Sequence, residues 1–361
     1  MANQIPGVYS EVDASAAVAG LDANEQVICI IATGTSDDTI LELTNKAYVP
    51  YSLDDAIEKY GNDSNIVKLM STTLANGGKR FIIVRVDDVT VPATPDYVKA
   101  LEIAEYEEAI DIVIFDSTNP LHHTLLKNHN KTTSENRKER IAFVGFAAGT
   151  DMATVTTKAK ELNTGQVFTF HPNVLDVNGD ELSGIYGAAA LAGQVAAELD
   201  PSMPMTNVQL NGFYGLATKL KDTEMETLID SGVIPLETRN GVIKIVRCIS
   251  TYTKNAEGQD DITWQEITTV RITHHIFKDM REMLTNKYSR ARQTKDTRDN
   301  ISSDVLSKLL EYQGLEYIEN VVPEDVTIMI NPLNPLRNDV DFKYDVTGPL
   351  NVIYLTGHLV I

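Results

Sequence analysis

The sequence predicts an α/β protein of several domains, with a central parallel sheet flanked by helices and extended β-strand arms at both ends of the chain. One observation predicts the core: apolar runs of strand length alternate with helical patterns, at a spacing that suits parallel strands joined by crossover helices. A second observation predicts the arms, because both ends of the chain read as strands with no obvious partner in the chain.

Composition narrows the possible functions. The chain has 361 residues, of which 43% are hydrophobic and 23% charged, an ordinary composition for a globular protein. Its net charge of −20 argues against direct binding of nucleic acid, whose backbone is itself anionic. We expect no membrane insertion, since no apolar run approaches the roughly 20 residues that span a bilayer, and no secretory signal, so that assembly takes place in a cytoplasm. Cys29 and Cys248 are expected to be buried thiols.

The first part of the core reads as a compact β-α-α-β unit over about 25–90. Val27 to Ala32 is an apolar run typical of a buried strand. Ser52 is placed as an N-cap of a helix that Gly61 stops, and a second helix is predicted over Asn65 to Ala75. Phe81 to Val86 is the next strand.

The middle of the chain repeats the order strand, helix, strand. The predicted strands are Ile110 to Phe115, Ile141 to Phe146 and Gln166 to Phe170. The predicted helices are Leu121 to Glu139, Met152 to Leu162 and Gly184 to Leu199. The last of these is rich in glycine and alanine, so we expect it to approach its neighbours closely.

The last part of the chain is predicted to hold strands over Val242 to Cys248 and Ile262 to Val270, two helices and a terminal hairpin. In that hairpin an alternating stretch over 340–346 turns at Gly348-Pro349 into the apolar end, Asn351 to Ile361. The sequence therefore predicts five parts: an N-terminal arm 1–24, a first α/β subdomain 25–95, a middle α/β domain 96–204, a C-terminal core domain 205–346 and a C-terminal arm 347–361.

Motifs that would indicate an enzyme are not completed. Gly78-Lys79 lacks the upstream glycine of a phosphate-binding loop. Asp176 to Glu181 fits a hairpin turn on Asn178-Gly179 better than a calcium loop. His122, His123 and His129 read as a solvated helix face rather than a metal site. We predict no catalytic, cofactor-binding or metal-ligating residue.

One charged feature stands out in this acidic chain. Five cations with a single carboxylate among them fall within residues 287–298: Lys287, Arg290, Arg292, Lys295 and Arg298. Two interpretations are open. The cluster is a solvated helix end, or it binds an acidic surface, including that of another copy of this chain.

Several segments together resemble contractile tail sheath proteins of myophages, prophages and phage-tail-like bacteriocins. Those segments are Pro6-Gly7-Val8-Tyr9, Ala75 to Gly78 with Phe81 to Val86, Ala188 to Gly193 with Pro201 to Pro204 and Leu210-Asn211-Gly212, and Asn240 to Arg247 with Thr251-Tyr252, Trp264 to Ile267 and Val270-Arg271. The resemblance covers nearly the whole chain in order.

The resemblance implies a structural subunit without enzymatic activity. Such subunits form stacked hexameric rings wound helically around a tail tube, with baseplate and tail terminator proteins as further partners, and contract to drive the tube through a cell envelope. The implied location is a virion tail or a bacteriocin particle. The resemblance also implies that each subunit's arms complete sheets in neighbouring copies.

The unpaired strands at the two ends of the chain indicate which residues would join one copy to the next. The inter-subunit arm residues are Val8, Tyr9, Val12, Val352, Ile353, Tyr354 and Leu355. Gly20 and Gly348 are the predicted hinges, because glycine permits large dihedral changes at little cost. The basic cluster is a predicted contact with the tube or another subunit.

Two other classes remain open from sequence. One is a cytosolic α/β hydrolase or nucleotide-dependent enzyme that uses the carboxyl edge of the sheet around Asp116 and Ser117, although nothing in the sequence brings His171 there. The other is a non-contractile filament or shell protein with the same arms.

Overall fold

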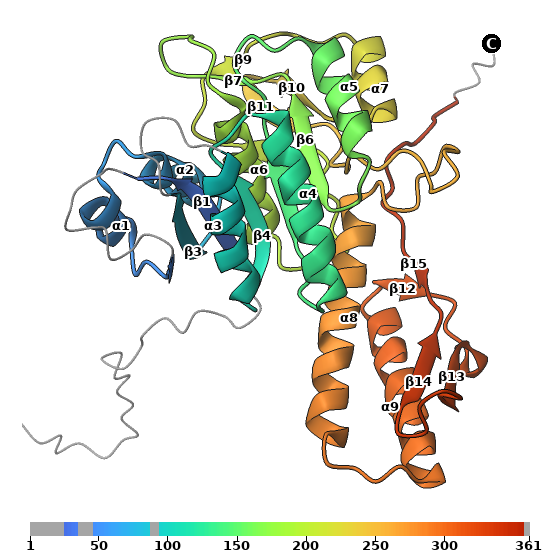
Figure 1. Ribbon diagram of the computed structural model, residues 1–361. Helices are drawn as coiled ribbons and strands as arrows, with labels where there is room; N and C mark the ends of the chain where they lie inside the picture. Colours follow the sequence, from blue (N-terminus) through green and yellow to red (C-terminus); the bar gives the residue numbers. More distant parts are fainter. Residues whose placement is uncertain (1–24, 35–45, 87–93, 357–361) are drawn as a thin grey trace, which may run out of the picture.

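The computed structural model describes residues 25–34, 46–86 and 94–356 of the chain. A wide α/β body carries a narrower C-terminal part that projects from one side of it (Figure 1). This confirms the predicted mixed α/β class with a large, mainly parallel sheet and flanking helices.

The body is built on one sheet of nine strands in the order β2-β3-β1-β4-β5-β6-β10-β11-β8. The six strands from β3 to β10 in that order are parallel, while β2, β11 and β8 run antiparallel to their neighbours. Their bounds are β1 Val27–Thr33, β2 Ala47–Tyr48, β3 Arg80–Val86, β4 Ile110–Phe115, β5 Ile141–Val144, β6 Val167–His171, β8 Gln209–Leu210, β10 Ile234–Arg239 and β11 Val242–Ile245. The strands of the first predicted subdomain thus share a sheet with those of the middle one.

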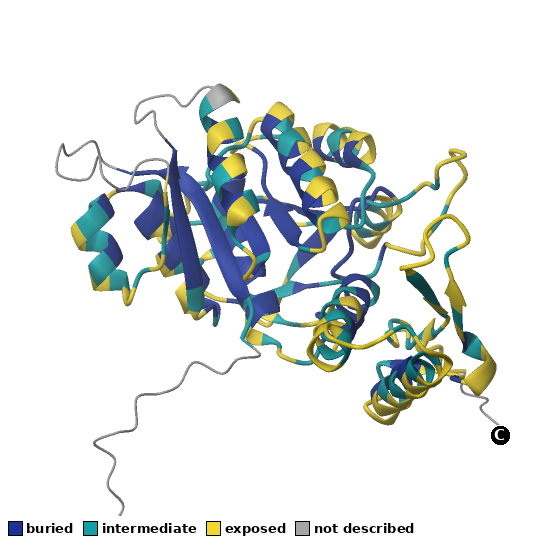
Figure 2. Cartoon of the chain, turned by 60° about the horizontal axis from the view of Figure 1, so that its bottom comes forward, coloured by how far each residue is buried: buried dark blue, intermediate teal, exposed yellow. Residues whose placement is uncertain are grey.

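Helices cover both faces of this sheet. One face packs on α1 (Leu53–Tyr60), α2 (Asn65–Ala75) and α6 (Gly184–Ala197). The other packs on α3 (Thr94–Tyr106), α4 (Pro120–Glu135) and α5 (Met152–Leu162), with α7 (Asp222–Asp230) beside α5. Strands covered on two faces must be apolar along their length, and all seven residues of β1 are buried (Figure 2).

Local sequence signals explain the helices that were predicted. The Ser52 side chain caps α1 and Gly61 ends it with a φ of 81°, as expected. The small residues of α6 are required by packing, since a Cβ on Gly187 would lie 2.2 Å from the Phe170 ring and one on Gly193 would lie 2.6 Å from the carbonyl oxygen of Thr73. Close approach of this helix is confirmed, and so is the burial of Cys29 and Cys248.

The C-terminal part consists of two long helices and two small sheets around their own apolar cluster. Helix α8 spans Ile267–Tyr288 and α9 spans Lys295–Gly314. Strands β12 (Ile318–Glu319) and β15 (Asp345–Val346) pair with each other, as do β13 (Val326–Ile330) and β14 (Asn338–Phe342). In the body, β7 (Val174–Leu175) and β9 (Gly215–Leu216) form a separate antiparallel pair, although α6 and β8 lie between them in the sequence.

One predicted strand is wrong. Residues 262–266 form no strand, and α8 already begins at Ile267, where the sequence predicted a strand over Ile262 to Val270. The backbone N–H of Ile267 donates to the carbonyl of Cys248, and Ile267 and Val270 are buried in the core of the body. Packing of a helical turn on that core overrides the β-branched composition. No helix in the described ranges is both long and apolar enough to cross a bilayer.

Candidate assembly surfaces

The C-terminal helices are joined to the body by charged side chains beyond the first turn of α8. Lys278 Nζ lies 2.5 Å from Asp111 Oδ1, at the start of β4. Arg281 donates two hydrogen bonds to the Glu139 carboxylate, one of them 2.8 Å long. Because both carboxylates precede or begin core strands, these pairs fix α8 against the amino ends of the parallel strands.

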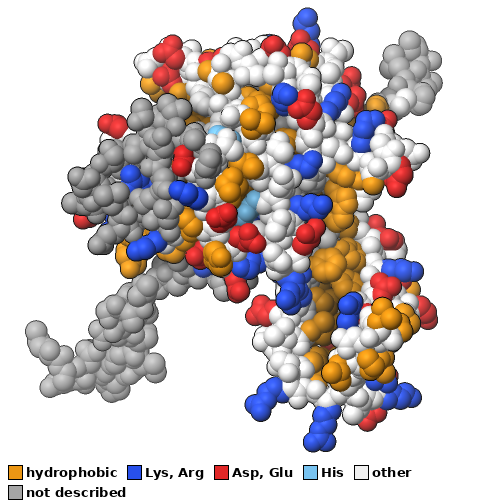
Figure 3. Space-filling view, in the orientation of Figure 1, with side chains coloured by type: hydrophobic (Ala, Val, Ile, Leu, Met, Phe, Trp, Pro, Cys, Tyr) orange, Lys and Arg blue, Asp and Glu red, His pale blue; other side chains and the backbone are white. Residues whose placement is uncertain are grey.

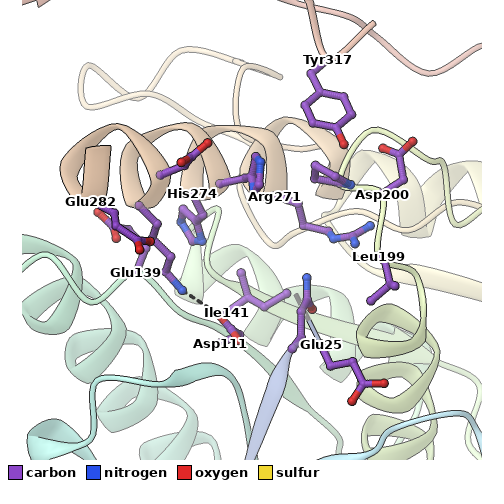
Figure 4. A pocket seen from close by; sticks show the side chains of 15 residues that line it. Glu25, Asp111, Glu139, Ile141, Leu199, Asp200, Arg271, His274, Glu282 and Tyr317 are labelled. Atoms are coloured by element: carbon purple, nitrogen blue, oxygen red, sulfur yellow. Dashed lines mark hydrogen bonds and ion pairs between the residues drawn. The ribbon is translucent and has the colours of Figure 1, made fainter. Parts of the chain in front are cut away.

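A cavity of about 660 Å³ lies at this junction (Figure 4). Buried Arg271 donates from Nη2 to the carbonyl of Glu198 at its edge. Acidic residues from the body and from α8 line this cavity, among them Glu25, Asp200 and Glu282. The seam between the two parts of the molecule is therefore polar, unlike the apolar cores on either side of it.

The sheet formed by β13 and β14 offers free strand edges. Within the described ranges each of these strands pairs only with the other, over five residue pairs from Val326↔Phe342 to Ile330↔Asn338. Met329 and Ile330 on β13 are 66% and 45% exposed. Unpaired backbone donors and acceptors beside exposed apolar side chains make this edge a template for another strand.

The segment after β15 leaves the C-terminal part and runs along the outside (Figure 1). Residues 347–356 form no strand or helix, and Asn351 donates a hydrogen bond of 3.0 Å to Glu266. The predicted terminal hairpin is therefore wrong within the described residues, because β14 pairs with β13 and β15 pairs with β12 instead. The four predicted arm residues that follow, Val352, Ile353, Tyr354 and Leu355, are 63% to 93% exposed. Gly348 is exposed, with no atom within 4 Å of the position of a Cβ. Within the described ranges, this exposed apolar segment pairs with no strand.

The predicted arm and hinge residues near the N-terminus lie outside the described residues. Val8, Tyr9, Val12 and Gly20 belong to this group. Their roles as arm and hinge residues stay predictions.

The basic cluster gathers at the free end of the α8–α9 pair. Lys287 lies in the last turn of α8 and forms an ion pair of 3.0 Å with Asp304 on α9. Arg290 and Arg292 lie in the exposed turn between the helices, and Lys295 and Arg298 begin α9. Within the described ranges these last four make no ion pair. Lysine and arginine side chains project from that end of the molecule (Figure 3).

The edge around Asp116 and Ser117, weighed as an enzyme site, is a hydrogen-bonded brace. Asp116 Oδ2 accepts from the backbone and side chain of Thr33 and from Asn65, and Oδ1 accepts from the Tyr97 hydroxyl at 2.6 Å. Ser117 Oγ lies 2.7 Å from His122 Nδ1. The contacts of Asp116 tie the carboxyl ends of β1 and β4 together. His171 lies on β6, which β5 separates from β4.

The predicted solvated histidine face of α4 is wrong. His122, His123 and His129 are 4%, 1% and 8% exposed. His129 Nε2 lies 3.0 Å from Nη1 of buried Arg140, and burial lowers the pKa of His129 to about 3. In the part of the chain that the structure describes, no cluster of three or more His, Cys, Asp or Glu side chains could hold a metal ion.

Free strand edges, an exposed apolar terminal segment and a basic end are the features of a structural protein that assembles. A model of the phage tail sheath protein central domain matches residues 90–251, and one of the phage tail sheath C-terminal domain matches residues 259–359. The chain belongs to the phage tail sheath family.

Relatives agree with this assignment. A tail sheath protein of Bacillus phage SP01 is 26% identical over 303 residues, which are 82% of this chain and 49% of that protein. One of Mycobacterium phage Bxz1 is 25% identical over 226 residues, 57% of this chain and 39% of that protein. The chain thus spans about half the length, or less, of the curated relatives it matches.

Solved structures share the fold. A sheath tail protein from Listeria innocua superposes with a TM-score of 0.73 and 14% identity, over 90% of this chain and 93% of that one. The helical sheath of the anti-feeding prophage in its contracted state gives a TM-score of 0.70 and 14% identity, over 99% of both chains. The contracted sheath complex of the extracellular contractile injection system PVC gives 0.71 and 14%, over 100% of this chain and 99% of that one.

Proposed function

We propose that this chain polymerises as stacked hexameric rings around a tail tube and contracts to drive the tube through a target cell envelope. Its partners are other copies of itself, the tube protein, and the baseplate and tail terminator proteins. It assembles in the host cytoplasm and acts in the tail of a virion or a bacteriocin particle. It does so as a structural subunit without catalysis.

The free edges of the β13–β14 sheet carry this proposal. They lie in the same small domain from which the exposed segment Val352 to Leu355 departs. A strand that leaves one copy and pairs with an edge on the next makes a heterologous contact, and contacts of that kind propagate as a helix or close as a ring.

Removing the C-terminal arm tests the proposal. A chain that lacks residues 351–361 should stay folded and soluble, because the apolar clusters of the molecule are formed by the preceding residues. It should no longer form tubes with a helical surface lattice, measured by sedimentation and negative-stain microscopy. An unfolded or insoluble product would show instead that the arm pairs within its own chain.

A point substitution sharpens the test. Ile353→Pro removes one ladder donor from the arm and should weaken polymerisation, whereas the control Ile353→Val keeps the donor and the strand preference. Equal polymerisation of the two variants would argue against strand exchange at this residue.

A further inference from the structure

The loop between β13 and β14 repeats a three-residue pattern, Asn331-Pro332-Leu333 and then Asn334-Pro335-Leu336. In each repeat the asparagine Oδ1 accepts from the N–H of the leucine two positions on, at 2.9 Å for Leu333 and 3.1 Å for Leu336. The backbone N–H of Asn331 donates to the carbonyl of Arg337 at 2.8 Å and closes the loop. Two prolines and these bonds hold the loop in one shape.

This ordered loop presents both leucines to solvent. Leu333 is 93% exposed and Leu336 is 90% exposed. Because the loop backbone is already ordered, a leucine on it loses little backbone entropy on binding, which favours its use as an anchor in an interface. Sequence reasoning missed this feature, although the repeat itself was visible.

The leucine loop adjoins the basic turn. The side chain of Gln293, in the turn between α8 and α9, donates a hydrogen bond of 3.0 Å to Asn338, the first residue of β14 after the loop. Two exposed leucines and the exposed cations Arg290 and Arg292 thus belong to one surface. Its complement is an acidic surface with an apolar hollow.

The shape of the molecule indicates which partner contacts the surface formed by the leucine loop and the basic turn. Subunits arranged in a ring each occupy a wedge that narrows toward the axis, so the slimmer end of the chain belongs inside. The C-terminal part, with two helices and small sheets, is narrower than the nine-stranded body (Figures 1 and 2). This step rests on the proposed function, which places the tube on that axis.

We propose that Leu333 and Leu336 are the apolar anchor of the contact with the tail tube, and that Arg290 and Arg292 supply its electrostatic part. The tube protein would offer carboxylates around a hollow that takes the two leucines. Rings would still form without the anchor, since the arms join the copies to one another.

The test uses the full-length chain and tubes assembled from the tube protein of the same particle. Leu333→Ser with Leu336→Ser should leave tube-free polymers unchanged and weaken co-sedimentation with tubes on the order of thirtyfold. The remaining binding should stay sensitive to salt. Arg290→Glu with Arg292→Glu should weaken binding to the tube and remove much of that sensitivity to salt.

Leu121→Ser is the matched control, because Leu121 is an aliphatic residue on α4 that is 67% exposed. This variant should bind tubes as the wild-type chain does.

Each other outcome overturns the inference. If the leucine variant bound tubes as tightly as wild type, the two leucines would have no role in the contact with the tube. Loss of tube-free polymers would place the loop between copies of this chain. A wild-type chain that forms polymers but binds no tube would refute the tube as partner, and one that forms no polymers at all would refute the proposed function itself.

Discussion

At the residue scale, the buried pair of His129 and Arg140 shows where charge and burial conflict. Arg140 is fully buried and donates to the carbonyl of Ala104 at 2.8 Å as well as contacting His129. Burial comes first and the neighbouring guanidinium second in lowering the pKa of His129 to about 3. The histidine is therefore neutral in the folded protein at neutral pH and can accept from Arg140.

This pair predicts acid sensitivity. The pKa of His129 is lower in the folded than in the unfolded state, where it is about 6.5, so only the unfolded state takes up a proton as pH falls below about 6.5. The free energy of unfolding should fall by about 2 kcal/mol for this group between pH 6.5 and 5. Urea unfolding of His129→Gln should show a weaker pH dependence than wild type over that range. His275 is more exposed, although burial among tyrosines lowers its pKa as well, so a larger effect from His275→Gln would contradict this account.

At the element scale, hydrophobic periodicity predicted the helices and strands whose formation depends mainly on local sequence. The buried strands β1, β3 and β4 and the capped helices α1, α2 and α5 follow from apolar runs and end signals. The start of α8 did not, because its β-branched residues suit a strand equally and only packing on the core favours a helix. The pairing of β13 with β14 was also missed. A loop separates the two strands, and the hydrophobic pattern does not show that the strands on its two sides pair.

The polar seam at α8 gives a prediction for an element. Arg281→Met removes the hydrogen bonds to Glu139 and to the carbonyl of Arg137, and leaves a largely buried carboxylate unpaired. We expect a loss of about 1 to 3 kcal/mol in the free energy of unfolding, and faster amide exchange in α8. Lys254→Met is the control, because its ion pair with Asp260 is exposed and should contribute at most about 1 kcal/mol. Equal losses of unfolding free energy in the two variants would mean that the ion pair at the seam stabilises the fold no more than an exposed surface pair does.

At the scale of the whole molecule, the proposed assembly combines a body that has packed cores with an exposed C-terminal arm. The body has apolar clusters on both faces of its sheet, and the C-terminal part has a cluster of its own. Val352 to Leu355 and the cations Arg290 and Arg292 are exposed, which an arm and a contact surface both require, while their roles in assembly stay predictions. The sequence could not show that the leucine loop and the basic turn meet, since 40 residues separate Gln293 from Leu333 and only the fold joins them.

In the proposed contraction the arms keep their pairing while the bodies move, so some residue between them would change its dihedral angles. Gly348 is the predicted hinge in the described chain, two residues after β15 and ahead of the exposed segment. Its φ is not in the left-handed region, and a Cβ there would meet no atom within 4 Å, so Gly348→Val fits the present conformation.

We therefore expect Gly348→Val to fold and to assemble extended sheaths, but to slow or block their contraction, because a β-branched residue has fewer backbone conformations open to it. Electron microscopy of tails exposed to a contraction trigger would measure the fraction that shortens. Gly314→Val, at another open glycine in the last turn of α9, is the control for the added side chain. Normal contraction of Gly348→Val would place the hinge elsewhere. A requirement for ATP in wild-type contraction would overturn the larger idea that the energy is stored in the packing of the subunits.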